Sequence, residues 1–397
     1  MSSRRRRVVA VIFGGRSVEH DVSIVTGHQI MDAFPADGYE IVPVYISRDG
    51  RWFTGDALAR LDNFKDENIL QRAGVKACLL SPDARHHGLI VDPLAPRFSK
   101  SDVRRIDVAF PALHGSHGED GSIQGLFELA DIPYVGYATL GSALTNDKIM
   151  TKTILRQAGI PVLDDHWVAR EDWLAEPDSV IAEILRRFSF PLFIKPATLG
   201  SSIGIGRADS EALLRASIDV AANFDRRIMI EPAVTDGIEV NCSVIGLGQH
   251  FEASTLEQPL SWDDFLSYED KYLRGGEGMK SAERLLPAPI SDELTERIKE
   301  TSIAAFKAVD GRGIARIDYL VRPDRNELYL NEINTMPGSL AFYLWREDGY
   351  TTTDLAQKLV QLALDAHVEK RRTLYDYQTN LVDLASQRGI KGSKGSK

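Results

Sequence analysis

The residues best suited to chemistry lie in the stretch 313–338, where two apolar runs flank a polar turn. Such a pattern predicts a β-hairpin. Because side chains alternate between the faces of a strand, Asp318 lies on one face of the first strand, and Glu332 and Asn334 share a face of the second. Three oxygen donors on facing strands suit Mg²⁺, which proteins commonly share with substrate phosphates. The alternative is that each carboxylate is a solvated residue on an open sheet face.

The surroundings of these donors favour a metal site. Arg316 lies two residues before Asp318, and a Pro-Gly pair ending at Gly338 follows the second strand. This run strongly resembles the metal-binding end of the ATP-grasp ligases, and specifically of the D-alanine–D-alanine ligases. The resemblance implies that the three oxygen donors bind Mg²⁺ in two sites, which Mn²⁺ could also fill. It also implies that Arg316 and the backbone amide of Gly338 stabilise an oxyanion.

The bulk properties indicate a soluble multidomain protein of the cytoplasm. The chain has 397 residues with 43% hydrophobic and 26% charged side chains, which suits two or three globular domains. A formal net charge of −10 argues against a nucleic-acid-binding surface. Cys78 and Cys242 show no metal-type spacing, as expected of reduced thiols. No apolar run approaches membrane length, so we expect no nucleic-acid or membrane partner.

Alternating strand and helix patterns predict a doubly wound α/β domain over residues 1–145. A β-branched run at 8–13 predicts a buried parallel strand, helical spacing covers 22–34, and a second strand covers 39–46. Residues 54–104 are polar and irregular, and we interpret them as an insertion on this domain.

The remainder of the chain predicts two further domains and a tail. Residues 146–248 have the pattern of a small α+β domain, and residues 249–370 combine a polar loop, the hairpin and flanking helices. Low-complexity Lys-Gly-Ser repeats indicate that 371–397 is a flexible tail. With the resemblance, these segments imply an ATP-grasp fold in which 146–248 is the lid domain and 249–370 the catalytic, metal-binding domain.

A loop rich in glycine and serine follows Lys195 and ends at Gly206. Glycines let backbone amides approach a phosphate closely, and hydroxyls add donors. Most such loops are only turns, and the Walker spacing of a P-loop is absent. The loop is similar to the family's flexible loop over the ATP phosphates. That similarity implies that Lys195, Ser202 and, from an earlier helix, Lys148 bind the phosphates.

The segment from Ile230 to Glu239 resembles the part of the family's site that binds adenine and ribose. By resemblance, Glu231 accepts the adenine amino hydrogens and Glu239 a ribose hydroxyl. The spacing between them is one residue longer than is usual in the family. Glu239 could instead be an exposed acid at a strand start. Lys271 is the remaining nucleotide-binding residue that the resemblance implies.

Two loops of the N-terminal half resemble the family's first-substrate site. Glycines before Glu19 could also suggest a dinucleotide-binding fold, but Gly-x-Gly-x-x-Gly is absent, which argues against hydride chemistry. The resemblance implies that Glu19 orients the amino group of the first substrate and that His114 helps to bind its carboxylate. Taken alone, His114 would be an ordinary loop histidine.

The long polar loop contains Lys271 and Tyr272. In the family this loop closes the site and excludes water from a reactive phosphate. The resemblance implies that Tyr272 bonds with Ser201 and Glu19. Related ligases that make esters replace this tyrosine, so its presence favours an amine as the second nucleophile. The alternative is a solvated loop that contains one aromatic side chain.

One departure from the family concerns the second substrate. A family serine that helps to bind the second carboxylate is matched here by Tyr343. From that position the larger tyrosine cannot donate to a carboxylate without moving the substrate. Ser339 or another group would therefore supply the contact, or the pocket accepts a different partner.

The resemblance as a whole implies an ATP-dependent carboxylate–amine ligase that joins two D-alanines through an acyl phosphate. Its product would be a peptidoglycan precursor, its substrates are small amino acids, and the family is commonly homodimeric. The first alternative is a related ATP-grasp ligase with a different second substrate, forming another dipeptide or an amide. The second is a nucleotide-binding protein that has lost catalysis.

Overall fold

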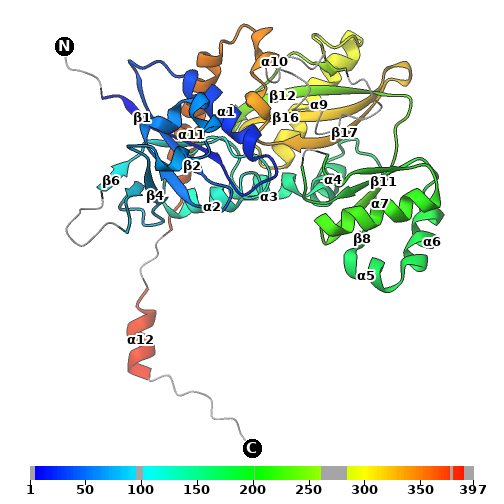
Figure 1. The fold of residues 1–397 in the computed structure, drawn as a ribbon. Coiled ribbons are helices and arrows are strands. Elements are labelled where there is room, and N and C mark those ends of the chain that lie inside the picture. Colours follow the sequence, from blue (N-terminus) through cyan, green and yellow to red (C-terminus); the bar gives the residue numbers. More distant parts are fainter. Residues whose placement is uncertain (1–4, 95–101, 201, 261–283, 376–378, 389–397) are drawn as a thin grey trace, which may run out of the picture.

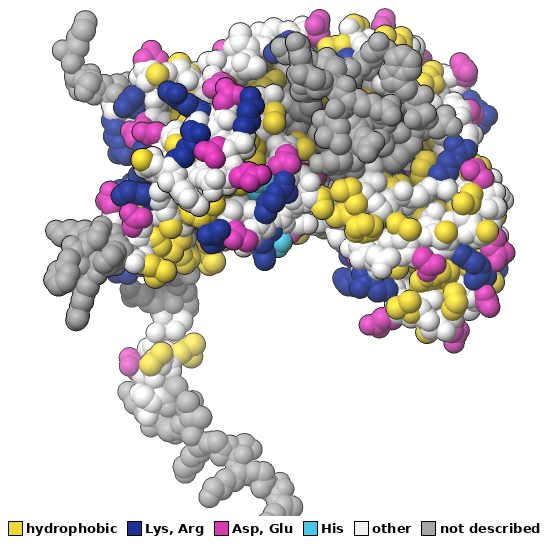
Figure 2. Space-filling view, in the orientation of Figure 1, with side chains coloured by type: hydrophobic (Ala, Val, Ile, Leu, Met, Phe, Trp, Pro, Cys, Tyr) yellow, Lys and Arg dark blue, Asp and Glu magenta, His cyan; other side chains and the backbone are white. Residues whose placement is uncertain are grey.

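The computed structural model describes residues 5–94, 102–200, 202–260, 284–375 and 379–388. Three large β-sheets and a two-stranded ribbon organise these ranges, with helices on their faces (Figure 1). On the face shown in Figure 2, acidic and basic side chains are interspersed. No helix in the described ranges is long and apolar enough to cross a membrane.

The N-terminal sheet has a parallel centre. Strand β1 (Arg7–Gly14) pairs in parallel with β2 (Tyr39–Ile46) and β7 (Val108–Pro111). Helices α1 (His20–Asp32) and α2 (Ser122–Leu129) accompany them. The β-branched residues of β1 are buried, as expected for a strand covered on both faces. The carboxyl ends of β1 and β7 therefore lie at one edge, where α/β proteins bind ligands.

Residues 54–104 are not the irregular insertion that we expected. Short strands continue the sheet in antiparallel pairs from β2, giving the order β6-β5-β4-β3-β2-β1-β7. Each strand is three to five residues long, too short to show a clear alternation in sequence. Their bounds are β3 Trp52–Thr54, β4 Lys76–Leu80, β5 Gly88–Val91 and β6 Asp102–Arg105.

The central part contains a four-stranded sheet of order β10-β9-β11-β8. The predicted glycine-rich loop after Lys195 connects two strands, because β9 and β10 pair in antiparallel on either side of it. The strands are β8 His166–Ala169, β9 Leu192–Pro196, β10 Gly206–Ala208 and β11 Arg227–Pro232. The helices are α3 Thr139–Asn146, α4 Lys148–Gln157, α5 Arg170–Ala175, α6 Pro177–Arg187 and α7 Glu211–Phe224.

The third sheet carries the predicted hairpin and has the order β13-β12-β16-β17. Strand β12 pairs with β16, so the two sheets divide before residue 238, earlier than the domain boundary we expected at 248. The strands are β12 Ile238–Leu247, β13 His250–Ala253, β16 Gly313–Arg322 and β17 Glu327–Asn334, with a ribbon of β14 Gln258–Pro259 and β15 Arg284–Leu285. The helices are α9 Asp292–Ala308, α10 Phe342–Arg346 and α11 Thr352–Lys370.

The first and third sheets share a hydrophobic core. Helix α11 packs against β7, β12 and β16, and its buried residues join those of β1 in one cluster. This shared core fixes the loops after β1 and β7 against the end of the hairpin. Helix α12 (Leu381–Arg388) stands apart from the body of the molecule in Figure 1.

Candidate active site

The register of the hairpin confirms that the predicted oxygen donors share one face. Asp318 pairs with Glu332, and Arg316 pairs with Asn334. The Arg316 guanidinium donates to both oxygens of Asp318, at 2.7 and 2.8 Å, and Asn334 Nδ2 donates to Asp318 at 2.9 Å. Burial alone would lower the pKa of Arg316, but the Asp318 carboxylate more than offsets this, and the pKa lies well above its ordinary value. Arg316 therefore stays charged.

A cavity of about 50 Å³ joins this face to the glycine-rich loop. Its lining includes most of the residues predicted to bind phosphate, ribose and metal. They are Lys148, Lys195, Ser202, Glu239, Asp318 and Glu332. These residues lie in segments from α4 to β17 that are far apart in the sequence, and the fold brings their side chains together around one cavity.

The two lysines have different partners in this structure. Lys148 Nζ donates to the carbonyl of Leu199 at 2.8 Å, and burial lowers the pKa of this lysine. Lys195 Nζ pairs with Glu231 Oε1 at 2.5 Å and donates to Asn331 Oδ1 at 3.1 Å. Asn331 was not predicted, because it lies at an irregularity in the pairing of β16 and β17 that the sequence does not mark.

Glu231 is fully buried and is paired with a second lysine that we did not predict, Lys152. Burial alone would raise the pKa of Glu231, but Lys152 and Lys195 lower it to about 2. The carboxylate is therefore ionised at neutral pH. Lys152 lies one helical turn after Lys148, so the two lysines share a face of the helix. That spacing was the one sequence signal that could have identified Lys152.

The N-terminal loop meets the central loop at Glu19. Its buried carboxylate lies so close to Gly200 that an added Cβ there would be 3.3 Å from Oε2. At Gly115, which has a φ of +69°, an added Cβ would be 2.5 Å from the same oxygen. Glycine is therefore required at Gly115, both by its backbone conformation and by the approach of Glu19.

His114 is buried and connects to two other elements through Thr26 of α1. Its Nε2 lies 3.0 Å from Thr26 Oγ1, and the amide of Ser339 donates to the same hydroxyl at 3.4 Å. Burial and, less strongly, Arg316 lower the pKa of His114 to about 4. At neutral pH this imidazole is uncharged, so it can contribute hydrogen bonds but no positive charge.

Glu119 is a half-buried acid five residues after His114, and we did not predict it as a site residue. It accepts from the amide of Gly115 at 2.7 Å and from the amide of Met336 at 3.1 Å. Burial, with Glu19 as a further cause, raises its pKa to about 8. Its contacts with Gly115 and Met336 join the loop after β7 to the segment that precedes Gly338.

The chain after Gly338 forms a strained turn. Ser339, Leu340 and Ala341 have φ angles of 49°, 51° and 49°, a left-handed conformation that non-glycine residues rarely adopt. Leu340 and Ala341 are fully buried, and that packing offsets the strain. The turn carries the Tyr343 hydroxyl to Glu257 Oε1, at 2.6 Å.

Three predicted residues, Ser201, Lys271 and Tyr272, lie outside the described residues. Their proposed roles stay predictions.

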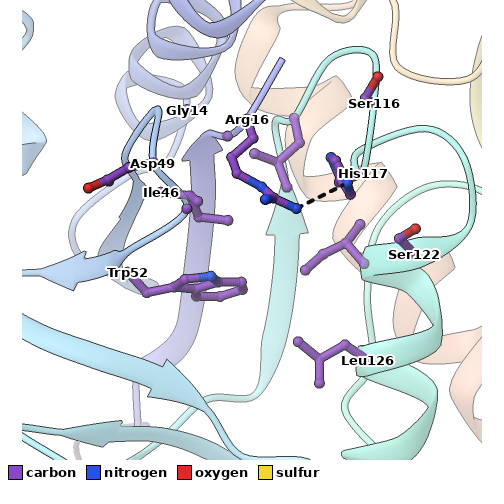
Figure 3. Close-up of a pocket in the computed structure, with 13 residues that line it drawn as sticks. Gly14, Arg16, Ile46, Asp49, Trp52, Ser116, His117, Ser122 and Leu126 are labelled. Atoms are coloured by element: carbon purple, nitrogen blue, oxygen red, sulfur yellow. Dashed lines mark hydrogen bonds between the residues drawn. The ribbon is translucent and has the colours of Figure 1, made fainter.

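A larger cavity of about 310 Å³ lies beside the N-terminal loop, and Figure 3 shows residues that line it. Arg16 Nη2 lies 3.4 Å from His117 Nε2 within this cavity. Trp52 and Leu126 form apolar parts of its wall. No residue predicted for the site lines this cavity, so it is separate from the cavity that contains the lysines and carboxylates.

The donors on the hairpin fit a divalent metal that is shared with phosphate. The described residues contain no group of three or more His, Cys, Asp or Glu side chains that could hold a metal by themselves. A carboxylate has about four lone-pair directions. The bonds from Arg316 and Asn334 therefore leave Asp318 with acceptor capacity, and Glu332 faces the same cavity. Two carboxylates and an amide leave positions for phosphate oxygens, as Mg²⁺ prefers.

Comparison with known proteins agrees with this geometry. A family described as D-ala D-ala ligase N-terminus matches residues 8–137, and one described as D-ala D-ala ligase C-terminus matches 154–361. The D-alanine–D-alanine ligase of Thermosipho africanus is 35% identical over 378 residues, covering 95% of this chain and 98% of that one. That of Thermoanaerobacter sp. is 38% identical over 372 residues, covering 92% and 99%.

Solved structures give the same result. The VanG D-Ala:D-Ser ligase of Enterococcus faecalis has a TM-score of 0.77 and 28% identity, covering 90% of this chain and all of that one. The D-alanine–D-alanine ligase of Coxiella burnetii has a TM-score of 0.77 and 27% identity, covering 96% and 100%. The fold is thus the ATP-grasp fold, as predicted. The chain belongs to the D-alanine–D-alanine ligase family, whose members use ATP and, in general, a divalent metal.

Proposed function

We propose that this protein is an ADP-forming ligase that joins two D-alanines to make a peptidoglycan precursor. The observation that carries the proposal is the convergence of lysines and carboxylates from two sheets on one cavity, with Glu19 of the N-terminal loop beside Gly200. Lysines at one end suit the phosphates of ATP, and an acid beside the loop suits the ammonium of an amino acid.

Phosphoryl transfer would take place at the cavity. Lys148 and Lys195 would bind the phosphates, and Lys195 would have to leave Glu231 to do so. A divalent metal, when bound by Asp318, Glu332 and Asn334, would neutralise phosphate charge. A carboxylate oxygen of the first D-alanine would attack the γ-phosphorus, and ADP would leave. With little covalent chemistry required of the protein, positioning and charge would supply most of the acceleration.

Ligation would follow at the loop around Gly338. The amine of the second substrate would attack the acyl carbon, lose a proton and expel phosphate. Arg316 and the amide of Gly338 would stabilise the oxyanion. Neutral His114 would orient the first substrate by hydrogen bonding. Glu231 and Glu239 remain the proposed adenine and ribose residues.

The direct test is ADP formation with and without D-alanine, with products identified by mass spectrometry. We expect D-alanine-dependent ADP and one D-alanyl-D-alanine per ATP. ATP binding without turnover would instead indicate a protein that has lost catalysis. D-serine, the second substrate named for the Enterococcus relative, belongs in the panel as an alternative acceptor. A strong preference for D-serine would assign a different second substrate.

We also propose that the protein is a cytoplasmic homodimer. Leu129 on α2 and Leu140 on α3 are 69% and 58% exposed, and exposed apolar side chains on neighbouring helices suit a protein interface. Sedimentation equilibrium checks this, and a monomer at micromolar concentration would contradict it.

A further inference from the structure

The residue that departs from the family, Tyr343, belongs to a polar cluster with Glu257, Asn241 and Arg284. Its hydroxyl donates to Glu257 Oε1 at 2.6 Å, and Asn241 Nδ2 donates to the same oxygen at 3.1 Å. Arg284 Nη1 donates to Glu257 Oε2 at 3.2 Å. The Arg284 guanidinium also lies over the Tyr343 ring, 3.9 Å from its centroid, where stacking and cation–π attraction both act.

The cluster lies on the same sheet face as the metal donors. Asn241 of β12 pairs with Asp318 and also bridges to Glu257, while Asp318 pairs with Glu332. Glu257, Asn241, Asp318 and Glu332 therefore form one row across the sheet. Tyr343 and Glu257 lie within electrostatic reach of Arg316. The cluster thus borders the place where the second substrate would meet the acyl phosphate.

Two features show that Tyr343 cannot simply replace the serine. Its hydroxyl is already bonded to a carboxylate that is only 2% exposed. Burial, with Glu257 as a further cause, raises the pKa of Tyr343, so the phenol remains protonated and keeps donating to Glu257. A carboxylate from the substrate would have to break this bond, leaving Glu257 buried without its donor.

A buried acceptor remains open beside the cluster. Among the described residues, Asn241 is 7% exposed and its Oδ1 has no hydrogen-bond partner. An unpaired buried acceptor is costly unless a ligand satisfies it. The cluster therefore presents a guanidinium and an open amide oxygen, which match the carboxylate and ammonium of an amino acid.

We propose that Arg284 binds the carboxylate of the second amino acid in place of the family serine. Glu257 and Tyr343 are positioning residues that hold the guanidinium by an ion pair and by stacking. This inference rests on the proposed ligase function. It implies that the acceptor is an α-amino acid with a free carboxylate, and that simple amines are poor acceptors.

The test compares D-alanine with D-alaninamide as second substrate, at saturating ATP and first-site D-alanine, with products resolved by mass spectrometry. The measured quantity is kcat/KM for D-alanine divided by kcat/KM for D-alaninamide. We expect Arg284→Gln to lower this ratio about tenfold to a hundredfold, because charge-assisted bonds to the carboxylate are lost. Arg284→Lys should fall between wild type and Arg284→Gln, because it keeps the charge but not the planar stack.

Glu257→Gln and Tyr343→Phe test the positioning roles. Both should raise the KM for second-site D-alanine by roughly threefold to tenfold, with the KM for ATP and for first-site D-alanine unchanged within about twofold. The matched control is Arg322→Gln. Its side chain is 21% exposed, against 22% for Arg284, and it also pairs with carboxylates, but at the far end of β16. It should leave the ratio unchanged.

An acceptor ratio that Arg284→Gln and Arg284→Lys leave as in wild type would overturn the proposal. Equal losses for both acceptors would overturn it too, because they would indicate a structural role. A wild-type enzyme that forms no D-alanine-dependent ADP contradicts the ligase function itself. An active wild type with an unchanged ratio contradicts only the role of Arg284.

Discussion

Replacing Lys152 with methionine should test how the buried carboxylate of Glu231, the residue proposed to bind adenine, is stabilised. Lys152 and Glu231 are both about 1% exposed, and Lys195 is the second cation on that carboxylate. The pKa of Glu231 falls from an ordinary 4.5 to about 2. At 1.36 kcal/mol per pKa unit, this shift corresponds to about 3 kcal/mol of stability. Removing one partner of a buried ion pair costs about 3–5 kcal/mol, which is the same order.

We therefore expect Lys152→Met to lower the free energy of unfolding by about 3 kcal/mol, measured by urea unfolding followed by circular dichroism. ATP binding should also weaken, because among the described residues Lys195 is then the one cation paired with Glu231, which holds it away from the phosphates. Adding Glu231→Gln should restore part of the loss, since it removes a buried charge that has lost one of its two lysine partners. The control Lys299→Met breaks a solvent-accessible pair with Glu296, whose oxygen lies 3.9 Å from the lysine nitrogen, and should cost under about 1 kcal/mol.

The direction of the pH dependence follows from the lowered pKa of Glu231. Its stabilisation is fully present above about pH 4.5 and is lost as the pH falls toward about 2. The stability gap between wild type and Glu231→Gln should therefore narrow over that interval. A loss below 1 kcal/mol for Lys152→Met, or a double variant as unstable as Lys152→Met alone, would refute the reasoning.

Three further predictions follow from the site. Glu332→Gln should lower turnover at least about a hundredfold with an unchanged free energy of unfolding, because the proposed metal site loses a carboxylate; near-normal phosphate release at saturating Mg²⁺ would contradict it. His114, with a pKa near 4 against an ordinary 6.5, destabilises the fold as the pH drops below 6.5. Between pH 7 and pH 4.5, the free energy of unfolding of His114→Gln should therefore fall by about 2 kcal/mol less than that of wild type. An equal fall in both proteins, measured by urea unfolding, would count against this. Ser339→Gly should raise the free energy of unfolding by about 1 kcal/mol by relieving the left-handed backbone, whereas Ser339→Val should lower it.

Much of the fold could be predicted because several strands are marked by long apolar runs in the sequence. The β-branched run of β1 and the two runs of the hairpin gave the right strands, and strand alternation gave the shared face of Asp318, Glu332 and Asn334. The register that pairs Asp318 with Glu332 came only from the structure. The strands β3 to β6 were missed because three to five residues cannot show a period. The early division between the second and third sheets was missed because pairing of β12 with β16 is not local.

The site residues that we did not predict were missed for a different reason, which is that their partners are distant in sequence. Glu119 acts through an amide 217 residues away, and Glu257 accepts from a tyrosine 86 residues away. Lys152 meets Glu231 across 79 residues. Residue type and spacing identify groups that can do chemistry. The side chains that hold those groups in place become visible only when the sheets are assembled.

Oxygen transfer from the first substrate tests the central claim most directly. D-alanine labelled with ¹⁸O in both carboxylate oxygens would be incubated with ATP and Mg²⁺, and the released phosphate analysed by mass spectrometry. A ligase that proceeds through an acyl phosphate transfers one ¹⁸O to each phosphate, with the dipeptide carbonyl keeping the other. Phosphate that carries no label, with ADP formed at the same rate, would contradict the account.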